Sequence, residues 1–535
     1  MTGTGLARLA LLVAGLTAVA SCTSAAPGGT EPKGTGTSAA LATGGTFAIA
    51  GSEIHSFDPY SDFDAAFIAP FAYDSLVNVD ARGEVVSGLA RSWTATTTRA
   101  VFTLRSGITC SDGSALTASD VANAINQAKD PKNNFGPPQQ ILPTVPFTVT
   151  GDDKTGVVTV TMSSPFSFIT RSIGILPIVC PRGLANLKSL DHATDGTGPY
   201  TLTSYKAGGP DTMTRRPGYA WGPDGAKTSV PGQPGKLVLE DIPSSSTAAN
   251  LLLTGGINAA IVSGADTARL DAEHLYKVDI STVLGLTSFN QRPGRILADP
   301  KLRTALVEAV NRTKAGEVAV GGGKVDLAGD VKARGTACYG NAAANLPAYD
   351  PGAARRLLDS DGWKTGPGGT REKNGKPLHL TLITPPDQAA TLPATSEFMA
   401  QEWKAIGVDT KVVTVTENAL VADLYQTGNW DVFVNATPNE PLPSQLVPFL
   451  AGPVPPKGVN FAGISNAAYV RLTSKALHLA GDASCPVWLQ AVGTLFKAAD
   501  VLVIANGATP YYGYKATFAL GNNFNLMPTT IRLYK

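Results

Sequence analysis

The chain has 535 residues, a formal net charge of +1 and 43% hydrophobic residues. Charged residues make up only 16%, against roughly 25% in typical soluble domains, and no basic cluster is interleaved with aromatic side chains. Proteins that follow nucleic-acid phosphates need such a cluster, so nucleic acid is not an expected partner. At roughly 150 residues per domain, the length predicts about three domains with room for a buried core.

The N-terminus has the pattern of an export signal. Arg8 precedes an apolar run from Leu9 to Ala20, and Val19-Ala20-Ser21 forms a small-residue cleavage site. The run is too short to span a bilayer comfortably. We therefore expect residues 1–21 to be removed as a signal peptide, so that the mature chain is exported.

Cys22 directly follows the expected cleavage site and resembles the cysteine of the bacterial lipobox, whose thiol is acylated. An ordinary signal peptide with a chance cysteine is the alternative. Each buried CH2 contributes about 0.8 kcal/mol, and stable anchoring needs more than one acyl chain. A diacylated or triacylated Cys22 would hold the protein at the outer face of the bacterial cytoplasmic membrane.

Residues 22–45 consist almost wholly of Thr, Ser, Ala, Gly and Pro, with only Glu31 and Lys33 charged. Such a stretch buries too little apolar surface to offset its ordering entropy. We expect a flexible linker with a root-mean-square reach of roughly 25 Å. The linker would let a folded body dock near the membrane.

Strand and helix patterns alternate along the rest of the chain. Residues 100–105 alternate apolar and polar as in a strand, and Thr117 with Asp120 forms a capping-box pattern at a helix start. Asp299 followed by Pro300 predicts another helix start. Further helices are expected at 352–361, 395–406 and 418–427, with strands at 379–383, 410–415 and 430–434. This alternation predicts an α/β fold with at least two lobes.

An ordered series of short motifs resembles the solute-binding proteins of family 5, the oligopeptide-, dipeptide- and nickel-binding components of ABC importers. The strongest match joins Phe102–Ile108 to Ser111–Val121. The others are Gly51–Pro59, Tyr73–Val77, Gly88–Trp93, Gly196–Tyr200, Arg216–Tyr219, Gly255–Ala260, Phe289–Asn290, Asp299–Arg303, Asn311–Arg312, Tyr349–Pro351 with Leu357–Leu358, and Gly428–Asp431. Together they cover nearly everything after the linker.

The resemblance implies an α/β fold of the periplasmic-binding-protein type II, in its large, cluster C form. Two lobes would close on a solute by hinge motion, with an extra subdomain inserted in the first lobe. Carried onto this chain, lobe I comprises 46–88, 195–285 and 504–535, the insert 89–194, and lobe II 286–503. Most family motifs have structural interpretations as turns, caps, ion pairs or core residues.

Four cysteines follow the linker: Cys110, Cys180, Cys338 and Cys485. Disulfides are the expected state in an exported chain, and three pairings are possible. Pairing Cys110 with Cys180 and Cys338 with Cys485 is favoured, because each pair falls within one part of the implied fold. Zinc binding is the rival, but no CxxC or HxxxH spacing occurs, so no metal site is expected.

The resemblance places candidate solute-binding residues on both lobes. On lobe I, Glu53, Ile54 and His55 match a stretch that lines the cleft in peptide-binding relatives and pairs with the ligand backbone. A plain surface strand end is the alternative. Tyr511 and Tyr512 match a strand that passes the cleft and would stack on a ligand or pack in the core.

On lobe II the matching segment is Asn435-Ala436-Thr437-Pro438-Asn439-Glu440-Pro441. In the relatives an aspartate stands two residues before the second Asn of this segment and receives the ligand's ammonium group. Here that position is Thr437, and a buried ammonium without a counter-charge costs several kcal/mol. Either Glu440 or Glu53 supplies the charge, or the solute is not anchored by a free amine.

The favoured function is therefore solute capture, most of all of oligopeptides, by a monomer that serves an ABC permease and its ATPase subunits. Sugars, other metabolites and metal chelates are the alternatives within the fold, although the five histidines are widely scattered. No catalytic residue and no cofactor are expected, because G-x-S-x-G, H-E-x-x-H and P-loop motifs are missing from the sequence. An exported hydrolase with a scattered site and a surface scaffold are the competing classes.

Overall fold

The computed structural model describes residues 40–61, 63–130, 137–143, 145–322, 325–333, 335–385, 389–437, 442–521 and 524–535. Cys22, Glu440 and most of the expected linker lie outside these residues. Within them, no helix is long and apolar enough to cross a membrane. We keep the names lobe I, insert and lobe II for the three parts implied by the family resemblance.

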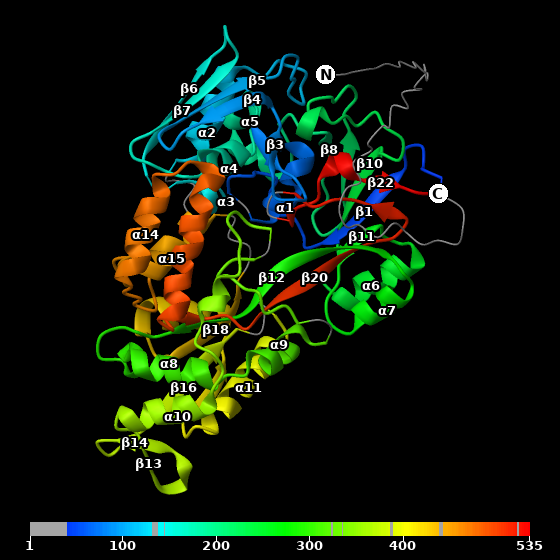
Figure 1. Cartoon of the computed structure of the whole chain (residues 1–535). Coiled ribbons are helices and arrows are strands. Elements are labelled where there is room, and N and C mark those ends of the chain that lie inside the picture. Colours follow the sequence, from blue (N-terminus) through cyan, green and yellow to red (C-terminus); the bar gives the residue numbers. More distant parts are fainter. Residues whose placement is uncertain are drawn as a thin grey trace, which may run out of the picture.

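One large mixed sheet runs through both lobes (Figure 1). Its strand order is β17-β16-β18-β12-β20-β11-β1-β10-β9-β8, and β19 pairs with β12 beside this path. The bounds are β1 Thr46–Gly51, β8 Tyr200–Ser204, β9 Asp211–Arg215, β10 Lys236–Asp241, β11 Ala259–Ile261, β12 Tyr276–Phe289, β16 His379–Thr384, β17 Asp409–Thr414, β18 Val432–Thr437, β19 Val501–Leu502 and β20 Ala505–Gly513.

In lobe I, β1 lies between the parallel strand β10 and β11. Helix α1 (Phe63–Ala72) follows the loop after β1, while α6 (Ser245–Thr254) and α7 (Asp266–Ala272) pack on the other side of the sheet. Two short pairs complete the lobe: β2 (Val77–Val79) with β3 (Val85–Ser87), and β21 (Ala516–Thr517) with β22 (Arg532–Leu533).

The insert forms its own four-stranded antiparallel sheet in the order β4-β5-β7-β6. Helix α2 (Ala118–Ala128) begins with the capping box of Thr117 and Asp120 predicted from the sequence. Its apolar residues Val121, Ile125 and Ala128 are buried on one face. The remaining elements are β4 Ala90–Ala95, β5 Arg99–Leu104, β6 Phe147–Asp152, β7 Val157–Met162, α3 Pro137–Ile141, α4 Ile169–Ser172 and α5 Pro181–Ala185.

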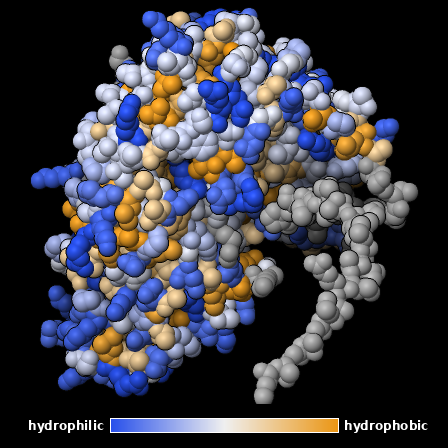
Figure 2. Space-filling view, turned by 45° about the horizontal axis from the view of Figure 1, so that its top comes forward, coloured by the Kyte–Doolittle hydropathy of each residue, from blue (hydrophilic) through white to orange (hydrophobic). Residues whose placement is uncertain are grey.

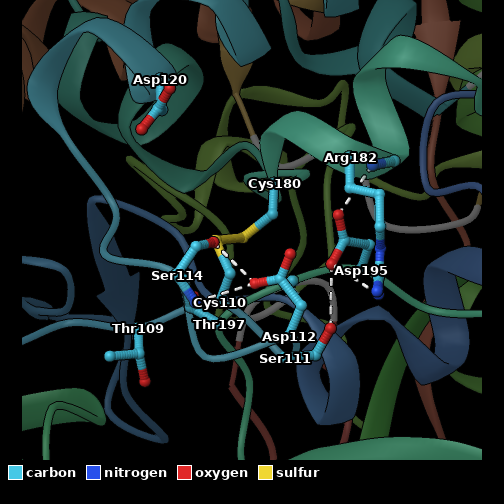
Figure 3. Close-up of a disulfide and its surroundings, with 12 residues drawn as sticks. Thr109, Cys110, Ser111, Asp112, Ser114, Asp120, Cys180, Arg182, Asp195 and Thr197 are labelled. Atoms are coloured by element: carbon cyan, nitrogen blue, oxygen red, sulfur yellow. Dashed lines mark hydrogen bonds and ion pairs between the residues drawn. A yellow bond between two sulfur atoms is a disulfide. The ribbon is translucent and has the colours of Figure 1, made fainter.

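A disulfide between Cys110 and Cys180 fastens the turn before α2 to the start of α5 (Figure 3). Asp195 lies beside it and accepts hydrogen bonds from Ser111 Oγ at 2.9 Å and from the Gly183 backbone N–H at 2.7 Å. The second disulfide joins Cys338 to Cys485 within lobe II. Both pairs are those favoured by the sequence.

Lobe II packs helices on both faces of β16, β17 and β18. The first core cluster joins α8 (Pro300–Ala309), α9 (Arg312–Val320), α10 (Pro351–Ser360) and α11 (Leu392–Lys404) to one face. The second joins α12 (Glu417–Ala422), α13 (Pro443–Ala451), α14 (Ala467–Leu477) and α15 (Cys485–Lys497) to the other. A small three-stranded antiparallel sheet of β13 (Lys364–Thr365), β14 (Arg371–Lys373) and β15 (Lys376–Pro377) projects from this lobe.

The chain passes from one lobe to the other along the paired strands β12 and β20 (Figure 1). Gly285 in β12 has φ +68°, and a Cβ there would lie 2.6 Å from Cγ1 of Ile504. Only glycine satisfies both the backbone and the close approach. The two lobe boundaries that the family resemblance implies, 285/286 and 503/504, therefore lie side by side.

Arg312 fixes the backbone at this crossing. Its guanidinium donates to the carbonyl oxygens of Val503 at 2.7 Å, Leu327 at 3.0 Å and Ile504 at 3.2 Å. Burial lowers the pKa of Arg312 to about 10, which leaves it charged at neutral pH.

The described end of the expected linker, residues 40–45, makes backbone hydrogen bonds with the folded body. Ala42 donates its N–H to Leu533 O at 2.9 Å, and Lys535 N–H donates to Ala40 O at 3.0 Å. Ala40 and Ala42 are thus bonded to the C-terminal end of the chain. Composition cannot reveal a backbone partner nearly 500 residues away.

Replacing Arg312 with alanine should lower the free energy of unfolding by about 3 kcal/mol, because three buried carbonyls lose a charged donor. Urea unfolding measures the loss. The control is Arg356→Ala: the Arg356 side chain is 72% exposed in its ion pair with Asp350, so its loss should cost less than about 1 kcal/mol. Equal effects of the two substitutions would contradict the role given to Arg312.

Candidate functional site

Three family motifs meet at the buried carboxylate of Asp74. Tyr219 Oη donates to Oδ1 at 2.7 Å, while Thr197 Oγ1 at 2.9 Å and Trp221 Nε1 at 3.1 Å donate to Oδ2. Desolvation raises the pKa of Asp74, and the three donors only partly offset that effect. Asp74 thus joins the segments after α1, before β8 and after β9 into one polar centre.

A cavity of about 160 Å³ lies next to this centre, between lobe I and the insert. Residues of α1, the loop 73–79, α3, the stretch 175–177 and the C-terminal stretch 521–529 contribute to its wall. Eight of the described lining residues are prolines: Pro59, Pro70, Pro137, Pro138, Pro177, Pro199, Pro223 and Pro528. Proline has no backbone N–H and a fixed φ, so these residues give a stiff wall poor in donors.

The described lining residues offer little free charge. Asp74 is the one ionisable acid or base among them apart from tyrosine, and both its oxygens are already bonded. Asn78 also lines the cavity, and its Nδ2 is buried with no hydrogen-bond partner among the described residues. A buried donor without a partner costs about 1–3 kcal/mol.

The three candidates on lobe I lie just after β1 but do not share one environment. Ile54 is 6% exposed and belongs to the core, whereas His55 is exposed. Glu53 is half-buried, and its Oε1 accepts the backbone N–H of Gly208 at 2.9 Å in the β8–β9 turn. None of the three lines the cavity beside Asp74. Their role in solute binding stays a prediction.

On lobe II, Asn435 and Ala436 occupy successive positions of β18 and therefore point to opposite faces. Ala436 is buried in the core under α8 to α11. Asn435 is half-buried, pairs with Leu286 of β12 and shares its face with Phe433. Thr437 ends the strand, opposite Val283. Glu440 lies outside the described residues.

Tyr511 and Tyr512 have the packing role that the sequence left open beside stacking. The Tyr511 ring is 1% exposed and packs edge-on against Phe518, with centroids 5.0 Å apart. Tyr512 is fully buried, and its hydroxyl donates to Asp271 of α7 at 2.9 Å. Stacking on a ligand would require either ring to leave the core, so the expectation that they bind solute is corrected in favour of packing.

The described residues contain no group of three side chains that could hold a metal ion. His192 stacks on Tyr205 with ring centroids 4.2 Å apart, and His379 pairs with Asp409 at 2.7 Å on the surface. On the face in Figure 2, apolar residues lie in small groups among polar ones.

The sequence identifies Tyr73–Val77, Gly196–Tyr200 and Arg216–Tyr219 as family motifs but does not show that they lie together. The one indication of contact was the acid Asp74 in the first motif, with a tyrosine in each of the other two. The eight prolines that line the cavity did not indicate a cavity in the sequence, because prolines in loops are normally interpreted as turns.

Comparisons with known proteins agree on one family. Residues 84–452 match the family described as bacterial extracellular solute-binding proteins, family 5 Middle. Protein XP55 of Streptomyces lividans is 27% identical over 356 residues, which are 62% of this chain and 60% of XP55. The chain thus matches less than two thirds of that relative's length.

Solved structures show the same fold. A substrate-binding protein from Microbacterium hydrocarbonoxydans, complexed with 4-hydroxybenzoate hydrazide, is 24% identical with a TM-score of 0.67, covering 91% of this chain and 99% of its own. The oligopeptide-binding protein AppA of Bacillus subtilis, in complex with a nonapeptide, is 19% identical with a TM-score of 0.68, covering 93% and 100%. Both likenesses support the type II two-lobe fold expected from the sequence.

The pH dependence of stability tests the environment of Asp74. Because its pKa is raised on folding, its contribution is complete below the ordinary carboxyl pKa and is lost as pH rises through the raised value. The wild type should therefore lose stability relative to Asp74→Asn as the pH rises above the ordinary carboxyl pKa of about 4. Urea unfolding of both proteins across this range measures the difference, and a constant difference would contradict a raised pKa.

Proposed function

The chain belongs to the bacterial extracellular solute-binding proteins of family 5, and from this premise we propose that it is the lipid-anchored receptor of an ABC importer. Members of this family bind solutes for ABC importers and are not enzymes. The proposal adds that Cys22 carries the anchor, that residues 23 to about 39 form the linker, and that a monomer closes its lobes over one solute.

The solute is the least constrained part of the proposal. Oligopeptides remain the favoured class, because AppA of Bacillus subtilis was solved with a nonapeptide on the same fold. The single observation that carries the proposed site is the cavity beside Asp74, whose described wall holds no free charge. We expect the solute to place an uncharged, largely apolar group there.

The loss of the acid at Thr437 is a separate observation on lobe II, because no described residue of that lobe lines the cavity. A free amine buried between the lobes would lack its usual partner there. Peptides would then be bound through an apolar side chain or a blocked end. Small neutral molecules are the second candidate class, favoured by the same uncharged wall and by the hydrazide bound to the Microbacterium protein.

Native mass spectrometry of the purified protein should reveal one solute per chain. A ladder of peptides with apolar side chains supports the favoured class, and a small neutral compound supports the second. A sugar or a metal chelate would contradict both, and turnover of a bound ester or peptide would overturn the receptor proposal itself.

Filling the cavity should weaken solute binding. Ala66 lines it on α1, so Ala66→Phe places a ring in the space that the solute needs. We expect at least a tenfold loss of affinity for the co-purified solute, equivalent to about 1.4 kcal/mol. Ala268→Phe, at an exposed position on α7, is the matched control and should bind normally. Unchanged binding by Ala66→Phe would place the solute elsewhere.

Replacing Cys22 with alanine should release the protein into the medium, because the acyl chains would have no attachment site. Fractionation of cells measures the release, and isothermal titration measures solute binding by the released protein. Binding should be intact. A variant that stays in the membrane fraction would contradict lipid anchoring at Cys22.

A further inference from the structure

The two disulfides differ in how well they are shielded from solvent. Cys110 and Cys180 are both 0% exposed, whereas Cys338 is 9% exposed and Cys485 is half-buried. A thiolate breaks a disulfide by attacking one of its sulfur atoms, so the rate depends on access to that atom. We call the bond between Cys338 and Cys485 the outer disulfide, and the bond between Cys110 and Cys180 the inner disulfide.

The inner disulfide is enclosed by a network of polar contacts (Figure 3). The Cys180 N–H donates to the carbonyl oxygen of Asp195 at 2.8 Å, and the Asp195 carboxylate accepts the N–H of Gly183 at 2.7 Å. On the other side, Arg216 donates to the carbonyl oxygen of Cys110 at 2.8 Å. A thiol can reach the inner disulfide only after these contacts open locally.

The backbone at one end of the outer disulfide is strained. Cys338 has φ +56°, in the left-handed region, where the Cβ of any residue except glycine crowds the backbone. Cys180 and Cys485 have ordinary φ values of −73° and −57°. Exposed or strained disulfides are the ones that exchange readily with thiols. The outer disulfide has both features.

The outer disulfide joins α15 to a segment that is bonded to β20. Cys485 is the first residue of α15, and Cys338 lies in the segment that follows α9. In that segment, the carbonyl oxygen of Asp326 accepts the Asn506 N–H at 2.8 Å, and the Tyr339 hydroxyl accepts Nδ2 of Asn506 at 2.8 Å. Breaking the outer disulfide would therefore release a covalent constraint close to the lobe boundary at 503/504.

Other bonds hold Cys338 in place without the disulfide. The buried Lys332 Nζ donates to the carbonyl oxygen of Cys338 at 3.3 Å and to the carboxylate of Asp330 at 2.8 Å. These contacts do not involve sulfur, so Cys338 stays near Cys485 after the bond is broken. Groups held close together react as if at high concentration, which favours re-formation of the same bond.

We propose that the outer disulfide is a thiol-exchange site, which a dithiol reduces reversibly in the folded protein while the inner disulfide stays intact. A thiolate of the dithiol attacks Sγ of Cys485, the S–S bond breaks, and Cys338 leaves as a thiolate that takes up a proton. The second thiol of the dithiol then attacks its own sulfur in the mixed disulfide and releases Cys485. Two electrons and two protons thus pass from the dithiol to the two cysteines.

This inference goes beyond the proposed function, because neither a solute nor the lipid anchor takes part in the exchange. The partner is defined only by its chemistry, as a dithiol. The reverse reaction with the disulfide form of the same reagent re-forms the bond between Cys338 and Cys485.

Thiol trapping tests the difference between the two disulfides in the folded wild-type protein. The protein is treated with dithiothreitol without denaturant, free thiols are trapped with iodoacetamide at intervals, and the labelled peptides are identified by mass spectrometry. Cys338 and Cys485 should be labelled at least about tenfold faster than Cys110 and Cys180. Equal rates, or faster labelling of the inner disulfide, would overturn the proposal.

Reversibility is measured on the same sample. After dithiothreitol is replaced by its oxidised form, peptide mapping should again show Cys338 bonded to Cys485. Failure of this bond to re-form would contradict a reversible site.

Amide hydrogen exchange shows whether the outer disulfide constrains the segment at β20. The double variant Cys338→Ser with Cys485→Ser should speed exchange of the Asn506 amide by at least about threefold, and leave amides of β5 unchanged. The matched control is Ala483→Ser, at an exposed position near α15, which should behave as the wild type. Equal acceleration at Asn506 and in β5 would mean general destabilisation and would count against a local constraint.

Discussion

The pairing of β12 with β20 is the constraint on which the rest of the structure depends. The two strands pair from Tyr276 opposite Gly513 to Leu284 opposite Ala505. Beyond this ladder, β12 continues beside β18 in the same sheet. The ladder ends at Leu284 and Ala505, and Gly285 and Ile504 lie in close contact directly after it. Arg312 binds the carbonyls of Val503 and Ile504, which fixes the backbone at that point.

Buried polar groups explain why most family motifs serve architecture. Asp74 collects donors from two other motifs, and Arg216 donates to the carbonyl oxygens of Thr109 at 2.9 Å and Cys110 at 2.8 Å. In lobe II, the buried pair of Arg303 and Asp500, 3.0 Å apart, fixes α8 against the end of α15. Removing one partner from such a group leaves the other buried without a partner or water, which makes these residues important for the stability of the fold.

Much of the fold was predictable from local chemistry. The capping box at Thr117 and the proline after Asp299 mark the starts of α2 and α8, because caps act within four residues. The helix expected at 395–406 begins earlier, at Leu392, since Pro393 fits the first turn of a helix. The two disulfides apart, contacts distant in sequence were not predicted, such as the backbone hydrogen bonds of Ala40 and Ala42 with the C-terminal end.

The candidate site was predictable only in part for the same reason. The family resemblance placed solute-binding residues at the ends of strands. In the structure, Tyr512 instead donates a hydrogen bond to Asp271 of α7, and Ala436 is buried in the core of lobe II. The cavity beside Asp74 is assembled from segments that each look like an ordinary turn. Among the described residues of its wall, Asp74 is the one acid, and both its oxygens are already bonded.

Small-angle X-ray scattering of the protein before and after removal of its co-purified solute tests the central claim most directly. A receptor that closes on its solute should show a smaller radius of gyration in the loaded form than in the empty form, with the difference restored on adding the solute back. An unchanged radius of gyration in both forms would contradict closure around a solute.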